Sequence, residues 1–208
     1  MVDIYFIRHA ECEMNLEFDT FIGGRSNHSP LTPKGISQAH KLGLRLAQEG
    51  ISFDKVYSSI AKRTMQTAEY AGKHAGFSLD DCALTPQIQE LDQGDWQGAT
   101  RDQTYTPDVL TTIRANPLDF RAPNGESQRD VEERMHAWTT ESILSNYHSD
   151  EKIGVITHGL AIKCFLRGML NSSPEMTYKT HIDNTSITKV RHSDRGWDLI
   201  SVNDSSHL

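Results

Sequence analysis

Short apolar runs rich in β-branched and aromatic residues recur along the chain and predict buried strands. The runs cover residues 2–7, 53–59, 83–90 and 152–157. In the third run, Pro86 predicts either an edge strand or pairing confined to its second half, because proline cannot donate to a ladder. Residues 186–190 and 197–202 predict a hairpin-type pair at the sheet margin, and the polar tail 203–208 is expected to fray.

Between these runs, apolar residues recur at helical spacing and predict amphipathic helices. The expected helices cover residues 33–50, 60–74, 128–147 and 160–170. Thr32 is the expected N-cap of the first helix, Ser58 or Ser59 that of the second, and Ser127 with Asp130 forms a capping box for the third.

The alternation of strands and helices predicts an α/β fold. We expect a three-layer sandwich in which a mostly parallel sheet with an antiparallel edge carries helices on both faces. Residues 1–208 are expected to form a single domain. Its least periodic part, residues 91–124, is punctuated by prolines and predicts a flap of short helices that covers the sheet edge and selects the substrate.

Composition narrows the class of protein. The formal net charge of -7 argues against non-specific binding to nucleic acid or to an anionic membrane surface, although a local cationic pocket is compatible with it. The three cysteines are widely spaced and form no C-x-x-C pair, so neither a disulfide framework nor a thiolate zinc site is expected. No leader segment or membrane-length apolar run is evident, and we expect a cytoplasmic protein.

Charged and ionisable residues stand where the predicted strands end. Ligands of open α/β sheets bind beyond the carboxyl ends of parallel strands, so these side chains are expected to meet. The alternatives are a surface Arg-His pair that caps an ordinary strand, and an exposed helix charge at position 63. The group consists of Arg8, His9, Arg63, Glu90 and His158.

Two arginines and two histidines around one carboxylate favour phosphoryl chemistry. Guanidinium forks match phosphate oxygens in bidentate fashion. One histidine can act as the nucleophile, and the carboxylate can protonate the departing oxygen. A metal site built from His9, His158 and Glu90 is the chemical alternative, which the adjacent arginines disfavour because they repel a cation.

Six sequence blocks carry a resemblance to a known family. They are RHAECEMN at 8–15, PLTPKGISQA at 30–39, SSIAKRTMQTAE at 58–69, ELDQGDWQG at 90–98, GES at 125–127 and HG at 158–159. Their residues and order resemble those of the histidine phosphatase superfamily, which is also called phosphoglycerate mutase-like. The resemblance implies the fold of that family and a reaction that needs no metal or cofactor.

The resemblance also implies a role for each residue of the group. His9 would attack phosphorus and become a transient phosphohistidine. Arg8, Arg63 and His158 would hold the phosphoryl oxygens. Glu90 would protonate the leaving oxygen and then activate the water that hydrolyses the phosphoenzyme. Attack requires neutral His9, and we expect the flanking guanidinium charges to depress its pKa.

The loop after the first strand contributes further candidates and two departures from the family pattern. Asn15, Gly23 and Arg25 are the candidate substrate- and phosphate-binding residues of this loop. Ala10 replaces the usual glycine and Cys12 the usual serine or threonine, which weakens an expected phosphate hydrogen bond. Cys12 is either a tolerated small residue or a redox-sensitive thiol beside the cationic pocket.

Within the family, the flap favours hydrolysis over phosphoryl return to glycerate. Mutases of this family carry a paired-arginine clamp and a tyrosine in the acidic loop, whereas Arg101, Arg114 and Arg121 are scattered here and Gln93 stands where the tyrosine would be. The sequence therefore predicts a phosphomonoester hydrolase that acts on a small phosphorylated metabolite. A phosphoglycerate mutase is the alternative; a non-catalytic phospho-ligand binding module is disfavoured because His9 is retained. A homodimer is left open.

Overall fold

The computed structural model describes residues 1–208 and is built on one six-stranded sheet with the order β3-β2-β4-β1-β5-β6. β1, β2, β3 and β4 run parallel to one another, whereas β5 pairs antiparallel with both β1 and β6. The strands are β1 (Val2–Arg8), β2 (Lys55–Ser59), β3 (Ala83–Thr85), β4 (Glu151–Thr157), β5 (Ile187–Ser193) and β6 (Gly196–Asp204). The mostly parallel sheet with an antiparallel edge is therefore confirmed.

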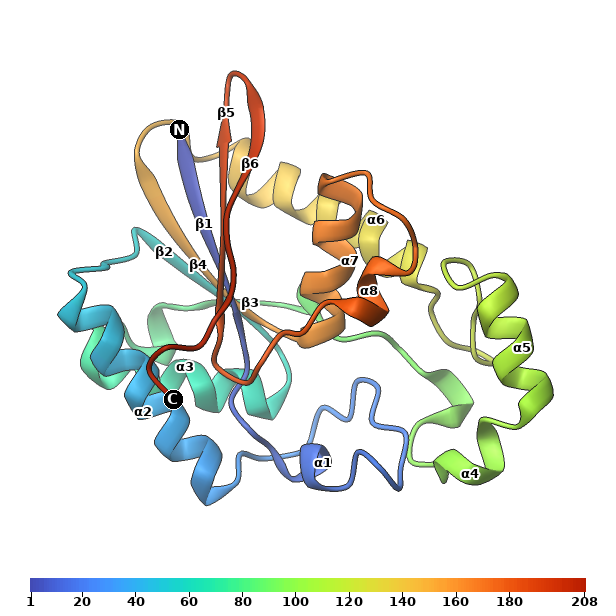
Figure 1. Cartoon of the computed structure of the whole chain (residues 1–208). Coiled ribbons are helices and arrows are strands. Elements are labelled where there is room, and N and C mark those ends of the chain that lie inside the picture. Colours follow the sequence, from blue (N-terminus) through green and yellow to red (C-terminus); the bar gives the residue numbers. More distant parts are fainter.

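Helices cover both faces of the sheet (Figure 1). The helices are α1 (Glu13–Leu16), α2 (Pro33–Gln48), α3 (Lys62–Ala75), α4 (Arg101–Thr104), α5 (Pro107–Ala115), α6 (Gln128–Trp138), α7 (Gly159–Met169) and α8 (Met176–Lys179). α2 and α3 pack on one face, and α6 and α7 pack on the other. None of these helices combines the length and apolar character that a bilayer crossing requires.

β1 contributes side chains to the core on both faces of the sheet. Its alternating side chains separate into two buried clusters, as the pleat of a strand requires. Ile4 and Phe6 join the cluster with α6 and α7, whereas Tyr5 and Ile7 join the cluster with α2 and α3. Both faces of β1 are thus buried, so Arg8 emerges directly from the core at the end of the strand.

Two of the three predicted helix caps are confirmed. The Thr32 hydroxyl accepts a hydrogen bond from the first turn of α2 at 2.9 Å, and Ser127 and Asp130 form the capping box of α6. The prediction that Ser58 or Ser59 caps α3 is wrong, because α3 begins without a side-chain cap. The Ser58 hydroxyl donates instead to the carbonyl of Ser59, the last residue of β2.

Two predicted elements are shorter than expected. Only the first half of the run predicted at 83–90 forms a strand, β3, which lies at the sheet edge and pairs with β2, so the edge-strand alternative is confirmed. Pairing confined to the second half is wrong, because Pro86 opens a 3₁₀ turn at Pro86–Ile88. The long helix predicted at 128–147 is α-helical only as far as Trp138, where α6 ends. A π-helical stretch follows directly at Thr139–Leu144.

The C-terminal tail does not fray as predicted. β6 extends to Asp204, whose carboxylate pairs with Arg45 of α2 at 2.5 Å. Beyond it, the His207 ring shares a hydrogen bond of 2.9 Å with the Thr185 hydroxyl. The polar composition that predicted fraying instead supplies partners that fasten the tail to α2 and to the turn before β5.

The predicted flap consists of the short helices α4 and α5 and the loops around them, and it lies to one side of the sheet (Figure 1). Its rings pack on one another: the Trp96 ring centroid lies 5.7 Å from that of Tyr105 and 5.5 Å from that of Phe120. The flap therefore has a small aromatic core of its own.

Candidate active site

The carboxyl ends of three adjacent parallel strands bring the candidate residues together. β4 lies between β1 and β2 in the sheet, so the residues that follow these strands share one edge. His9 follows β1, His158 follows β4, and Arg63 lies in the first turn of α3 after β2. The His9 and His158 ring centroids are 5.3 Å apart.

His9 is buried and oriented by its neighbours. Its Nδ1–H donates to the carbonyl of Ala10 at 2.7 Å, which leaves Nε2 as the ring nitrogen that can face a substrate. Burial, together with the charges of Arg63 and Arg8, holds the pKa of His9 well below its usual range. The imidazole is therefore neutral at pH 7, as nucleophilic attack requires.

A turn far along the chain fixes the backbone of His9. The Asn184 amide donates to the His9 carbonyl at 2.9 Å, and the Thr185 N–H donates to the carbonyl of Arg8 at 3.0 Å. Thr185 has a φ of 58°, in the left-handed region that β-branched residues rarely adopt. Such local strain persists where the surrounding structure requires it, and here it allows the turn to contact the end of β1.

The His158 ring is hydrogen-bonded to Arg63. The Arg63 Nη2 donates to His158 Nδ1 at 3.0 Å, so the ring proton of His158 is on Nε2, which donates to the Ser59 hydroxyl at 2.9 Å. Both ring nitrogens are therefore occupied and His158 is fully buried; its direct contact with a phosphoryl group stays a prediction. Burial first, then the Arg63 charge, holds the pKa of His158 well below its usual range.

Arg63 and Arg8 supply the positive charge of the site. The other end of Arg63 donates from Nη1 to the carbonyls of Arg25 at 2.8 Å and Ser26 at 2.9 Å. Arg8 donates from Nη1 to the carbonyl of Ile182 at 2.7 Å, while its buried Nε has no partner. Both guanidinium groups line the same cavity as His9, so each can place N–H donors on an anion there.

Glu90 reaches the site from the loop after the 3₁₀ turn. Its carboxylate accepts from the N–H of Leu91 at 2.9 Å and from the N–H of Leu160 at 3.1 Å. Leu160 lies in the first turn of α7, where backbone N–H groups are free. Glu90 also lines the cavity with His9, so a carboxyl group stands within the same enclosure as the candidate nucleophile.

The loop after β1 contributes two of its three candidates. Asn15 and Gly23 line the cavity. Arg25 does not: its guanidinium is bound by Asp92 and Glu126, each at 3.1 Å. The prediction that the Arg25 side chain binds phosphate is therefore wrong for this structure, because two carboxylates already satisfy that charge; Arg25 contributes its carbonyl to Arg63 instead.

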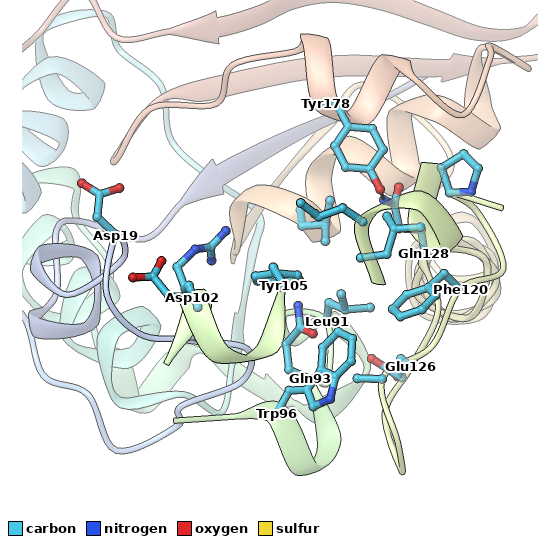
Figure 2. Close-up of a pocket in the computed structure, with 16 residues that line it drawn as sticks. Asp19, Leu91, Gln93, Trp96, Asp102, Tyr105, Phe120, Glu126, Gln128 and Tyr178 are labelled. Carbon is cyan, nitrogen blue, oxygen red and sulfur yellow. Dashed lines mark hydrogen bonds between the residues drawn. The ribbon is translucent and has the colours of Figure 1, made fainter. Parts of the chain in front are cut away.

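Two adjoining cavities complete the site. The smaller, about 180 Å³, is lined by every candidate catalytic residue except His158, and the larger, about 610 Å³, lies under the flap (Figure 2). Four residues line both: Leu91, Gln93, Arg101 and Leu160. Sequence reasoning placed substrate selection in the flap but missed Ser59, Asn184 and Tyr178, since none of them carries a local signal of proximity to His9. No set of three or more histidine, cysteine or acidic side chains is grouped as a metal site requires.

Comparisons with known proteins agree with this arrangement. The family model of the histidine phosphatase superfamily (branch 1) matches residues 4–205. A protein of Escherichia fergusonii described as a probable phosphoglycerate mutase GpmB is 30% identical, with 100% of this chain and 95% of that protein covered.

Solved structures are similar over the whole chain. YhfR of Bacillus stearothermophilus has 26% identity and a TM-score of 0.84, covering 100% of this chain and 99% of that one. A phosphoserine phosphatase of Entamoeba histolytica, solved in complex with 3-phosphoglyceric acid, has 27% identity and a TM-score of 0.83, with both chains covered completely. These matches confirm the predicted resemblance and the predicted fold class.

Proposed function

Because the chain belongs to the histidine phosphatase superfamily, we propose that it hydrolyses phosphomonoesters through a phosphohistidine intermediate. One observation carries the proposal: the free Nε2 of the neutral, buried His9 shares a cavity of about 180 Å³ with the guanidinium groups of Arg8 and Arg63 and with the carboxylate of Glu90. That cavity has the size and charge for a phosphoryl group and no room for a large ligand.

In the first step, the lone pair of His9 Nε2 attacks phosphorus and the ester P–O bond breaks. Arg8 and Arg63 neutralise the charge that develops on the phosphoryl oxygens, beside the buried ring of His9. The leaving oxygen takes the bonding electron pair together with a proton from the carboxyl group of Glu90, and the alcohol departs. His9 then carries the phosphoryl group and Glu90 is a carboxylate.

In the second step, a water molecule attacks the phosphohistidine. Glu90 accepts a proton of the water as the new P–O bond forms and the N–P bond breaks, which returns the electron pair to Nε2. Inorganic phosphate leaves, and His9 and Glu90 return to their starting protonation states. His158 and Ser59 hold Arg63 in place throughout.

A phosphoglycerate mutase is the second candidate, supported by the description of the 30% identical relative. A mutase must bind the carboxylate of glycerate beside the phosphoryl site. Of the three flap arginines, only Arg101 lines the two cavities of the site; Arg121 pairs with Asp130 at 2.7 Å, and Arg114 is exposed. A single cation at the junction favours hydrolysis over the mutase reaction.

The test is phosphate release in EDTA from a panel of phosphomonoesters, run beside a coupled assay for conversion of 3- to 2-phosphoglycerate. We expect release from members of the panel, and loss of that release in His9→Ala. Isomerisation without release would establish the mutase instead. No reaction in either assay, or release that survives in His9→Ala, would contradict the proposal.

A further inference from the structure

The larger cavity is placed to receive the part of the substrate that leaves. It opens from the phosphoryl cavity through Leu91, Gln93, Arg101 and Leu160, which line both. Leu91 follows directly after Glu90, and Leu160 donates its N–H to that carboxylate. The passage therefore begins beside the group proposed to protonate the leaving oxygen, so the alcohol portion of a bound ester would extend through it.

The walls of this cavity are mainly apolar and aromatic. Nine of its sixteen lining residues are hydrophobic. Figure 2 shows Trp96, Tyr105 and Phe120 grouped around Leu91, with Tyr178 facing them from the opposite side. Flat side chains that face one cavity favour a flat, apolar occupant, because offset and edge-on ring contacts add to the gain from burial.

Glu126 and Gln128, two of the polar side chains that line the cavity, already have partners. Glu126 pairs with Arg25 at 3.1 Å and with Arg134 at 3.0 Å. The Gln128 amide donates to the Tyr178 hydroxyl at 2.9 Å, and its oxygen accepts from Thr177 at 2.7 Å. A polyhydroxylated leaving group would lose its hydrogen bonds to water there and regain few of them, which is unfavourable.

Arg101 marks the polar end of the passage. Its guanidinium carbon lies 4.7 Å from the ring centre of Phe18 and 4.8 Å from that of Tyr105, and it forms no ion pair. Two stacked rings hold this cation without neutralising it. The guanidinium of Arg101 can therefore interact with the phosphoryl end of the substrate, whereas the rest of the larger cavity presents aromatic rings to the leaving group.

We propose that the substrates are phosphomonoesters of ring-containing, largely apolar alcohols, with the ring packing against the wall that Trp96, Tyr105 and Phe120 form on one side of the cavity (Figure 2). A volume of about 610 Å³ is that of a pocket for a drug-sized ligand, larger than the side chain of a phosphorylated amino acid or glycerate needs. This inference rests on the proposed phosphatase activity for its chemistry, but the cavity's preference can be measured without turnover.

The experiment compares ligands that differ only in the ring. Calorimetry would give Kd values for 4-phenylbutylphosphonate and butylphosphonate, which mimic the esters and cannot be hydrolysed. Steady-state assays would give kcat/KM for 3-phenylpropyl phosphate and propyl phosphate, whose leaving oxygens are both primary alkoxides. We expect the phenyl member of each pair to be favoured about 10- to 100-fold, the range for taking a benzene-sized ring out of water.

Variants connect the preference to the cavity. We expect Phe120→Ala to lower the phenyl-to-alkyl ratio about tenfold and Phe120→Leu to lower it less. Val109→Ala, a truncation on α5 of a residue that does not line the cavity, should keep the wild-type ratio. Both members of a pair are measured on the same sample, so the ratio is independent of the folded fraction of a variant.

The outcomes separate this inference from the proposed function. A phosphonate ratio near one, or a ratio that Phe120→Ala leaves unchanged, would overturn the inference even if phosphate is released. Higher kcat/KM for phosphoserine or 3-phosphoglycerate than for 3-phenylpropyl phosphate would also overturn it. A strong phosphonate preference without hydrolysis of any ester would support the ligand class and contradict the phosphatase proposal.

Discussion

The histidine behind Arg63 makes the stability of the fold depend on pH. His158 is fully buried, and burial together with the Arg63 charge holds its pKa well below 6.5. In the unfolded chain the same imidazole takes up a proton near pH 6.5. Below that pH the unfolded state therefore binds one proton more than the folded state, and the free energy of unfolding falls as the pH falls.

The size of the effect follows from the proton count. Above pH 6.5 the contribution is absent; between 6.5 and the lower pKa of folded His158 it is about 1.4 kcal/mol for each pH unit. We expect a loss of about 1.4 kcal/mol at pH 5.5 from this residue alone, and the loss grows with the same slope until folded His158 itself takes up a proton. Carboxylates with lowered pKa values add losses of the same sign, so wild type alone cannot isolate it.

The His158→Gln variant isolates the contribution of His158 to the pH dependence of the free energy of unfolding. Its amide can accept from Arg63 or donate to Ser59 but cannot titrate, so the stability difference between wild type and variant should shift by about 1.4 kcal/mol per pH unit below pH 6.5. Urea unfolding between pH 7.0 and 5.0, followed by the fluorescence of the three tryptophans, would measure it. His181→Gln, at an exposed histidine, is the control that should leave the difference constant.

Parallel pH profiles for wild type and His158→Gln would refute the reasoning. They would mean that His158 takes up its proton without unfolding, and hence that the hydrogen bond from Arg63 to Nδ1 breaks easily. The assignment of the ring proton to Nε2 would then fail, together with the view that His158 holds Arg63.

Three further changes test other parts of the molecule. Glu90→Gln should lower kcat/KM about 10²- to 10⁴-fold for an alkyl phosphate and much less for p-nitrophenyl phosphate, whose leaving group needs no proton; equal losses would exclude Glu90 as the acid. Ser127→Ala should lower the free energy of unfolding by about 1 kcal/mol in urea titrations, because α6 loses its N-cap. Gly43→Ala should cost about 1–3 kcal/mol in the same assay, since its Cβ would lie 2.2 Å from the carbonyl oxygen of Ala71; an unchanged midpoint would disprove the close packing of α2 on α3.

Local sequence signals were sufficient to predict most strands of the sheet and to predict that the residues following β1, β2 and β4 meet at one sheet edge. The apolar run before Arg8 has no polar interruption after residue 3, and residues 153–156, shortly before His158, carry no polar side chain, so both strands and their ends were predictable. The N-cap at Thr32 was predictable as well, because this hydroxyl residue directly precedes Pro33, a residue typical of the first helical position. In each case the deciding information lies within a few residues.

What could not be predicted depends on residues far apart in the chain. Arg25 is removed from the phosphate site by Glu126, 101 positions away, and Asn184 holds the His9 carbonyl across 175 positions. Ser58 or Ser59 was expected to cap α3, but the Ser59 hydroxyl bonds the ring of His158. A local rule assigns such side chains to their nearest backbone groups, whereas the fold supplies partners that periodicity cannot identify.

The position of β4 in the sheet determines when the site can exist during synthesis of the chain. β1 and β2 are not neighbours; each pairs with β4, which carries residues 151–157 and separates them. A ribosome that has released only the first 150 residues has therefore delivered His9 and Arg63 but not the strand that aligns them. Parallel pairing over so long a stretch of chain is slow to form. The nascent protein thus carries its proposed nucleophile for most of its synthesis without the cavity in which that residue is proposed to bind phosphate.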